Sequence, residues 1–299
     1  MRRAYEPGIR KWVMGVLSLF FLVGPSDCGY AAGGMAAAGP FGGLADRLIR
    51  DGFDTVWIRT LFSDPQCEFL PAIAQINLKH HEDTAAYGIF LEEKNIAIAE
   101  NYLTKFRPVL EQFHQKTAVP PEVVVAILLI ETKCGLDREK APVMNVLASI
   151  SVCSEKNILD AGFRVLQSQF PDVTRMEIRR RSRLRSRWGY KELRAFLKWA
   201  AREKVDRPLA IRGSWAGAWG LPQFVPSSLA AYAADGNQDG RIDLNEDVDA
   251  IASICNYLKK NGWKAGKSPA EQRRVIWRYN HSPLYVDTVL DVAERIRNP

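Results

Sequence analysis

The sequence predicts a mainly α-helical fold that carries one calcium loop of the EF-hand type. Apolar residues recur at three- to four-residue spacing in most segments after Phe41, with few candidate strands and no internal repeat. Three segments open with helix-start signals, Pro-Glu at 121–122 and Ser-Pro at 268–269 and 282–283. Because 47% of the 299 residues are hydrophobic and 25% are charged, the composition is that of a globular protein with a substantial core.

The N-terminal segment is predicted to be a secretory signal peptide over residues 1–32, followed by a flexible linker over 33–41. A basic start precedes the apolar run WVMGVLSLFFLVG, and small residues follow it. The run has 13 residues, which is short for a membrane-spanning helix. We therefore expect an exported, periplasmic protein, and a retained membrane anchor is the alternative.

The charge of the chain limits its partners. The formal net charge is +7, and it becomes +5 without residues 1–32, which carry four basic and two acidic side chains. An exported and mildly basic protein indicates an anionic partner outside the cytoplasm and argues against intracellular nucleic acid.

An N-terminal helical region is predicted over residues 42–118. Its clearest helix spans 92–116, with a kink or interruption expected at Pro108. Residues 154–205 are predicted to be helical with a strongly basic middle, and 247–263 form a clear amphipathic pattern. The segment GSWAGAWGLPQFVPSS, residues 213–228, has too many glycines and prolines for one long helix.

A buried helix is predicted where the chain reads VPPEVVVAILLIETKCG. Val123 to Ile130 is apolar all round, and Pro121 suits the first position of a helix. Glu131 therefore lies at the inner end of a buried helix. It is either a structural acid paired with Lys133 or a carboxyl whose pKa is raised by apolar surroundings, so that it donates a proton near neutral pH.

The segment DGNQDGRIDLNE, residues 235–246, matches a calcium loop. An EF-hand loop needs oxygen ligands at positions 1, 3, 5, 7, 9 and 12 and a glycine at position 6, here Gly240. The predicted ligands are Asp235, Asn237, Asp239, the carbonyl of Arg241, Asp243 through water, and Glu246. Ile242 is expected to pack inward. The alternative is an acidic turn that binds nothing.

This loop is expected to stabilise the fold rather than act as a sensor. Sensor loops come in pairs and open a methionine-rich groove. The chain has one such loop and five methionines, none of them between residues 177 and 299. We therefore expect a structural calcium ion.

Four cysteines lie beyond the predicted signal peptide: Cys67, Cys134, Cys153 and Cys255. In an oxidising compartment an even number permits disulfides, and the proximity of Cys134 and Cys153 in sequence makes them the preferred pair. Four buried free thiols are an equally good interpretation. No cysteine spacing is typical of a zinc site.

Several motifs occur in a specific order. Glu-Thr ends the apolar helix, and GSWAGAWGLPQFVPSS, the calcium loop, NYLKKNGW and RYNHSPLY follow. Over residues 42–299 this order resembles the lytic murein transglycosylase B family. The resemblance implies a lysozyme-like helical catalytic region over 119–299, which contains the loop 235–246. It also implies cleavage of the β-1,4 bond between N-acetylmuramic acid and N-acetylglucosamine in peptidoglycan, with formation of 1,6-anhydromuramic ends.

The resemblance also implies site residues. Glu131 matches the single catalytic acid and base. Six residues match the sugar cleft: Ser214, Gln223, Tyr257, Tyr279, Asn280 and Tyr285. The metal ligands match Asp235, Asn237, Asp239, Arg241 and Glu246. The implied partners are peptidoglycan glycan strands, with a wall-remodelling complex as a further partner, and we expect a monomer.

The residue types agree with these implied roles. Sugar sites place aromatic rings against apolar ring faces and amides against hydroxyls, and the C-terminal half offers Trp215 and Trp219 beside the tyrosines. Trp263 and Trp277 are expected in core packing. One carboxyl suffices for this reaction, because the 6-hydroxyl of the muramic acid, rather than a positioned water, attacks the anomeric carbon.

Two departures affect the expected grip on substrate. Members of the family carry Tyr-Pro-Arg-Arg soon after the catalytic helix, and the corresponding SISVCSEKNILDAGF has no arginine pair. Cys134 also stands where a bulkier residue is common. The Arg-rich segment RMEIRRRSRLRSR, residues 175–187, could meet acidic stem peptides, or it could be a solvated helix face.

Two other functions fit parts of the sequence. A murein-binding scaffold without turnover would explain the missing arginine pair, although Glu131 is retained. A hydrolytic muramidase would need a second carboxylate in the poorly matched middle of the chain.

Overall fold

The protein is described by a computed structural model that covers residues 39–76, 87–137, 141–169, 172 and 174–298. The mainly helical prediction is confirmed. The strands β1 (Ala141–Pro142) and β2 (Arg212–Gly213) are two residues each and pair antiparallel, with Ala141 opposite Gly213. The predicted signal peptide lies outside the described residues. Phe41, at the end of the predicted linker, is buried at the start of the first helix.

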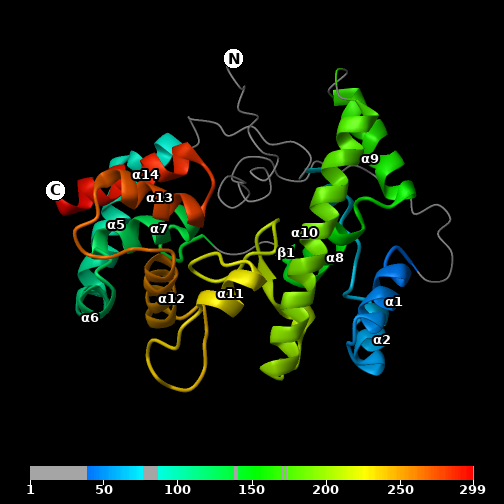
Figure 1. The fold of residues 1–299 in the computed structure, drawn as a ribbon, viewed down its shortest axis with the longest axis horizontal. Coiled ribbons are helices and arrows are strands. Elements are labelled where there is room, and N and C mark those ends of the chain that lie inside the picture. The colour runs from blue at the N-terminus through cyan, green and yellow to red at the C-terminus, as the bar shows by residue number, and fades with distance from the viewer. Residues whose placement is uncertain (1–38, 77–86, 138–140, 170–171, 173, 299) are drawn as a thin grey trace, which may run out of the picture.

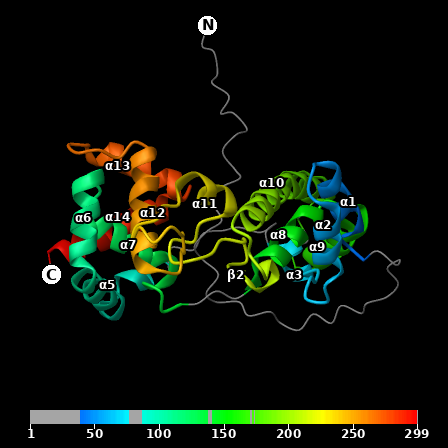
Figure 2. The same cartoon turned by 90° about the horizontal axis from the view of Figure 1, so that it is seen from below.

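The helices form two groups (Figures 1 and 2). One contains α1 (Gly42–Arg50), α2 (Thr55–Ser63), α3 (Pro71–Ile76), α8 (Val143–Val152), α9 (Lys156–Gln169) and α10 (Arg175–Arg202). The other contains α5 (Glu93–Lys105), α6 (Arg107–Thr117), α7 (Pro121–Thr132), α12 (Asp247–Lys260), α13 (Pro269–Tyr279) and α14 (Pro283–Arg297). The helix α11 (Pro226–Tyr232) and the strands lie between the groups, and the short 3-10 helices are η1 (Ile89–Leu91) and η2 (Pro208–Ala210). One continuous hydrophobic core joins both groups.

The predicted buried helix is α7. Every residue in it except Glu122 is buried, because α5, α6, α12 and α14 pack around it. It begins at Pro121 and ends where Lys133 and Cys134 take the left-handed conformation, with φ of 48° and 55°. This sharp end turns the chain away one residue after Thr132, so that Glu131 lies in the last turn of a helix held on all sides.

The predicted interruption at Pro108 is confirmed. Helix α5 ends at Lys105 and α6 begins at Arg107, with Pro108 in the first turn of the new helix. No single described helix is long and apolar enough to span a membrane; α6 and α7 pass that test only as a pair, and the chain bends by 116° between them.

Three expectations about side chains are wrong. The cysteine pair Cys134 and Cys153 forms no disulfide, and all four described cysteines are free. Burial raises the pKa of each of these thiols to about 12, which keeps them protonated. Ile242 is 37% exposed rather than packed inward, because Leu244 occupies the core position instead. Trp277 is also 37% exposed, whereas Trp263 is buried as expected.

Candidate active site

Glu131 meets the first turn of α14. Its side chain is 8% exposed, and the hydroxyl of the fully buried Tyr285 donates a hydrogen bond of 2.8 Å to its Oε1. Tyr285 is itself fixed, because its backbone N–H donates to the Ser282 hydroxyl that caps α14. Two helices distant in sequence thus hold a carboxyl and a phenol in a defined orientation.

A stack of aromatic rings extends from Tyr285. The rings of Tyr279 and Tyr285 are stacked 6.2 Å apart at 8°, and Tyr257 lies 4.8 Å from Tyr279. The hydroxyl of Tyr279 donates to the carbonyl of Pro222, and that of Tyr257 donates to the carbonyl of Arg278. The three predicted cleft tyrosines therefore form one cluster, which reaches Glu131 through Tyr285. The hydroxyls of the other two donate hydrogen bonds to backbone carbonyls.

The electrostatics of this cluster depend on one acid. Burial, and then the charge of Glu131, raise the pKa of both Tyr279 and Tyr285 well above the ordinary value. These phenols consequently stay protonated, and Tyr285 stays a hydrogen-bond donor. Within the described part of the chain, no second carboxylate contributes to either pKa shift.

The segment with Ser214 and Gln223 is folded into tight turns. The Ser214 hydroxyl accepts hydrogen bonds of 3.3 Å from the N–H groups of Ala216 and Ala218. Gln223 is buried with φ of +46°, and its side-chain amide donates to the carbonyl of Gly220. A non-glycine residue in this conformation is strained, which is common at functional sites. In this structure both polar groups serve their own turns.

Thr132 connects that segment to α7, the helix that carries Glu131. Its hydroxyl lies 3.2 Å from the carbonyl of Leu221 and 3.4 Å from that of Leu128. The ring of Phe224 packs against the rings of Tyr257 and Tyr279, with distances between ring centres of 5.7 and 5.9 Å. Neither contact was predicted from the sequence, although Thr132 directly follows Glu131 and Phe224 directly follows Gln223.

Asn280 lies in the corner between α13 and α14. It is buried, ends α13, and its carbonyl accepts a hydrogen bond from the N–H of Ser282. In the chain, Asn280 directly follows Tyr279 and precedes α14, the helix whose Tyr285 contacts Glu131.

The two tryptophans expected to face sugars have different environments. Trp219 is buried and packs on Phe196 and Trp199 of α10, so its ring supports the fold. Trp215 is half-buried beside Trp188, over a small cluster that includes Ile150. Only Trp215 of the two keeps a partly accessible ring.

A buried cation lies near Trp188. Arg185 is 9% exposed, and its guanidinium carbon is 4.8 Å from the centre of the Trp188 ring. Its Nε and Nη2 have no hydrogen-bond partner among the described residues. Burial lowers the pKa of Arg185 to about 10, which still leaves it charged at neutral pH.

The acidic side chains of the predicted calcium loop accept hydrogen bonds from backbone N–H groups of the same loop. Asp235 accepts from the N–H groups of Gln238 and Gly240, and Gly240 takes the left-handed conformation that the pattern requires, with φ of +86°. Glu246 caps α12 by accepting from Val248 and Asp249. Within the described ranges, no three acidic, His or Cys side chains gather closely enough to hold a metal ion.

The loop is tied to the turn beneath it by two unpredicted residues. Buried Asp249 accepts hydrogen bonds from the N–H groups of Gly236 and Asp243 and so closes the loop. The carbonyl of Leu244 accepts from the N–H of Leu221, whose own carbonyl meets Thr132. A path of three hydrogen-bonded residues thus leads from the loop to the neighbour of Glu131.

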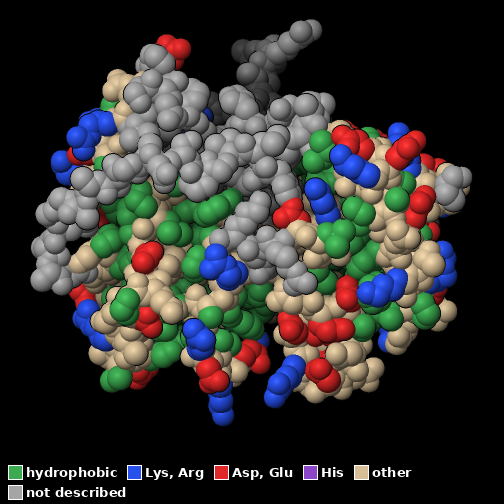
Figure 3. Space-filling view, turned by 180° about the vertical axis from the view of Figure 1, so that it is seen from behind, with side chains coloured by type: hydrophobic (Ala, Val, Ile, Leu, Met, Phe, Trp, Pro, Cys, Tyr) green, Lys and Arg blue, Asp and Glu red, His purple; other side chains and the backbone are tan. Residues whose placement is uncertain are grey.

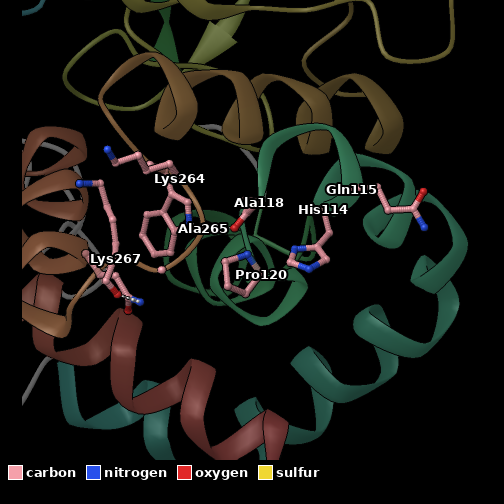
Figure 4. A pocket seen from close by; sticks show the side chains of 10 residues that line it. His114, Gln115, Ala118, Pro120, Lys264, Ala265 and Lys267 are labelled. Atoms are coloured by element: carbon pink, nitrogen blue, oxygen red, sulfur yellow. Dashed lines mark hydrogen bonds between the residues drawn. The ribbon is translucent and has the colours of Figure 1, made fainter.

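A pocket of about 500 Å³ lies at the other end of α7. His114, Pro120, Trp263, Lys264 and Lys267 are among its lining residues (Figure 4). Pro120 immediately precedes α7, so the pocket is separated from Glu131 by roughly 15 Å of helix. It is therefore distinct from the tyrosine site.

The mainly helical fold is that of the lysozyme-like lytic transglycosylases. The family model described as "Transglycosylase SLT domain" matches residues 40–274, and the chain belongs to this family.

Individual relatives agree with this assignment. The chain is 32% identical over 181 residues to membrane-bound lytic murein transglycosylase B of Escherichia coli (strain K12), which covers 60% of this chain and 42% of that protein. The soluble lytic transglycosylase SltB1 from Pseudomonas aeruginosa is 25% identical with a TM-score of 0.68, over 85% of this chain and 97% of that chain. A structure of the Escherichia coli lytic transglycosylase SLT35 in complex with calcium is 23% identical in sequence and has a TM-score of 0.67. The match covers 87% of this chain and 93% of that chain.

Proposed function

We propose that this protein is an exported lytic transglycosylase that cleaves peptidoglycan between N-acetylmuramic acid and N-acetylglucosamine and leaves 1,6-anhydromuramic ends. The observation that carries the proposal is the hydrogen bond from Tyr285 to the buried Glu131 in a chain of this family. The curated relative is a lytic murein transglycosylase, and the matched part is less than half of its length.

Glu131 acts first as an acid and then as a base. Its proton goes to the glycosidic oxygen as the bond to the anomeric carbon breaks, and N-acetylglucosamine leaves with a free hydroxyl. The 6-hydroxyl of the same muramic acid then forms a bond to that carbon and gives its proton to Glu131. The enzyme returns to its starting state, and no water is consumed.

One carboxyl is enough for this sequence of steps. A hydrolytic mechanism with two acids would place a second carboxylate near the first. Among the described residues, Glu131 is the acid that hydrogen-bonds the tyrosine cluster, and the transglycosylase reaction needs no other. Tyr285 orients the carboxyl and stabilises the ionised form by donating to it.

The remaining cleft residues form two sets. The wall around the reacting sugar consists of Tyr285 and its neighbours. The rings of Tyr257 and Tyr279 continue the stack from Tyr285, and Asn280 lies in the α13–α14 corner beside them. Ser214 and Gln223 form the second set, in the segment 213–228. A sugar that binds them would have to replace the hydrogen bonds that their side chains make to the backbone of this segment. Arg185 binds a carboxylate of the stem peptide, because two nitrogens of its buried guanidinium, Nε and Nη2, have no hydrogen-bond partner among the described residues.

The loop 235–246 binds a structural calcium ion through Asp235, Asn237, Asp239, the carbonyl of Arg241 and Glu246. These oxygen donors suit a hard cation, and Gly240 already makes the required turn. The related SLT35 has been solved in complex with calcium, which supports the assignment. When bound, the ion would neutralise the acidic side chains and hold the loop against Leu221.

The reaction product tests the proposal. Purified sacculi are digested by the protein and by Glu131→Gln, and the fragments are weighed by mass spectrometry. Anhydro-muropeptides from the native protein alone are expected. Reducing muropeptides, heavier by one water, would assign a muramidase instead, and an absence of fragments from folded protein would leave a murein-binding scaffold. Circular dichroism of the variant shows that lost activity is not lost fold.

A further inference from the structure

The outer side of α10 carries cations along its whole length. This helix has 28 residues, about 42 Å, and is seen along one side of its helix group in Figure 1. Seven of its residues, each three or four positions after the last, are basic: Arg180, Arg183, Arg187, Lys191, Arg194, Lys198 and Arg202. Because this spacing keeps side chains on one helix face, they form a continuous row of about 33 Å, here called the basic stripe.

The basic stripe lies opposite the buried face of the helix. Leu193, Phe196, Leu197 and Ala200 point into the core, whereas six of the seven stripe residues are exposed and Arg194 is half-buried. No acidic residue of α10 falls on the stripe: Glu177 lies on its flank and Glu192 is buried. On the face of the molecule that Figure 3 shows, cations and acids are interspersed.

Most of this charge is not neutralised within the protein. Among the residues that the structure describes, Arg180, Arg183, Arg187 and Lys198 make no ion pair. Lys191 is 71% exposed, and its nearest acid, Glu192, already accepts two hydrogen bonds from Ser227. Two other stripe residues are paired, Arg194 with Asp51 at 3.4 Å and Arg202 with Glu203 at 2.7 Å, so the unpaired cations are concentrated at Arg180, Arg183, Arg187 and Lys198.

This arrangement works against the stability of the helix. Like charges three or four residues apart repel each other, and cations in the first turns oppose the helix dipole. A solvated face that needed only solubility would mix both signs. The uniform sign therefore indicates an external polyanion that offsets the repulsion when it binds.

The composition of the stripe favours a hydrated polymer over a lipid bilayer. A helix that lies on a membrane places Trp, Phe or Leu beside its cations, so that they enter the headgroup region. The large exposed hydrophobics of α10 are Met176 and Leu184, both in its first half, and none follows Leu184. A flexible chain with regularly spaced carboxylates matches such a row better.

We propose that the basic stripe binds the carboxylates of peptidoglycan stem peptides and so holds the enzyme on its polymer. The inference rests on the proposed function, which supplies the polymer. The inner side of the same helix supports the site segment, through Glu192 on Ser227 and through Phe196 on Trp219. A strand on the stripe therefore lies behind the site and is a different stretch of the wall from the one being cleaved. Its effect is a higher local substrate concentration.

The test compares two triple variants of the full chain with equal charge. The stripe variant is Arg183→Gln, Arg187→Gln and Lys198→Gln. The control is Arg50→Gln, Arg107→Gln and Arg274→Gln, three exposed arginines on α1, α6 and α13 that make no ion pair among the described residues. Over a range of salt, binding is measured to intact sacculi by co-sedimentation and to immobilised glycan strands from which an amidase has removed the stem peptides. Turnover of a short soluble peptide-free glycan is measured in parallel.

The stripe variant is expected to bind intact sacculi about tenfold more weakly at low salt, with the difference shrinking as salt screens the charges. The control variant should bind intact sacculi like the native protein. Peptide-free glycan strands should bind the native protein and both variants with equal affinity. Turnover of the soluble glycan should be the same in all three proteins. Equal binding by both triple variants, or no binding of native protein to sacculi, would overturn the proposal. Loss of binding to phosphatidylglycerol vesicles with unchanged sacculus binding would assign the stripe to a membrane. Absence of soluble turnover by native protein would sink the proposed activity, whatever the sacculi show.

Discussion

The hydroxyl of Tyr285 donates to Oε1 of Glu131 across 154 residues of sequence, at 2.8 Å and with both side chains buried. A hydrogen bond to an ionised group in such a place contributes about 1.5–3 kcal/mol. It holds the carboxyl in one orientation, which the packing of α7 against α14 fixes.

Removal of this donor should slow the reaction without unfolding the protein. We expect Tyr285→Phe to lower kcat about 10- to 100-fold, because the carboxyl loses its orientation and the ionised form loses its donor. The alkaline limb of the pH–rate profile, where Glu131 loses the proton that it must donate, should move to higher pH because the carboxylate has lost its hydrogen-bond donor. Tyr190→Phe, which removes a phenol hydrogen bond of the same length to the carboxylate of Asp51, a pair with no proposed role at the site, is the matched control. An unchanged profile in Tyr285→Phe would show that the hydrogen bond has no role in proton transfer.

The turn that carries Gln223 should tolerate no side chain at Gly220. This glycine has φ of +75°, and a Cβ there would lie 2.3 Å from Cβ of Leu244 in the calcium loop. We expect Gly220→Ala to cost about 2–4 kcal/mol, from the left-handed conformation and the clash together. Gly266→Ala is the control, because that glycine has φ of +72° and open space, and should cost only about 1 kcal/mol. Equal urea midpoints for the two variants would contradict the close contact.

Calcium should stabilise the protein through the loop 235–246. At a free concentration of about one hundred times Kd, binding adds about 2.7 kcal/mol, which corresponds to a rise in Tm of about 5 °C or more. Asp239→Ala should abolish the rise, and Asp206→Asn, an exposed acid outside the loop, should keep it. If Tm does not respond to calcium or a chelator in the native protein, the loop is an acidic turn that needs no metal.

Glu271 should make stability depend on pH at the start of α13. Its carboxylate accepts from Ser268 and pairs with Lys267, and these contacts lower its pKa to about 2. A folded pKa below the unfolded value stabilises the protein above about pH 4.5, and the contribution is lost as pH falls towards 2. Glu271→Gln keeps the capping geometry but not the charge. Its urea midpoint should be lower than that of the native protein at pH 7, and the gap should narrow as pH falls below about 4.5 and close only near pH 2.

Local patterns predicted most of the helices correctly. Continuous apolar residues placed α7 in the core, and Pro108 marked the break between α5 and α6. The ordered motifs predicted the family, because such motifs are specific even when each is short. The resemblance assigned Glu131 and Tyr285 to the same cleft, but it did not predict the hydrogen bond between them, since no local signal relates residues so far apart.

The errors have one physical cause, which is that packing between distant elements is not written in local sequence. Proximity of Cys134 and Cys153 in the chain suggested a disulfide, but Cys134 follows the left-handed end of α7 and Cys153 packs against Ser182 of α10. Ile242 occupies the usual inward position of a calcium loop, yet Leu244 fills the space over Gly220. Asp249 was missed because its partners, Gly236 and Asp243, precede it by up to 13 residues.

Arg185 should show opposite effects on stability and on substrate binding. A buried guanidinium with two nitrogens lacking a described partner costs free energy, so Arg185→Met is expected to raise the free energy of unfolding by about 1–3 kcal/mol. If Arg185 meets a stem-peptide carboxylate, the same change should raise KM for peptide-bearing glycan about tenfold and leave peptide-free glycan unaffected. Arg181→Met, which removes an exposed cation paired with Glu177, controls for the loss of charge. A more stable variant with unchanged KM for both substrates would mean that Arg185 contributes nothing to binding, and that its cost to the fold has another origin.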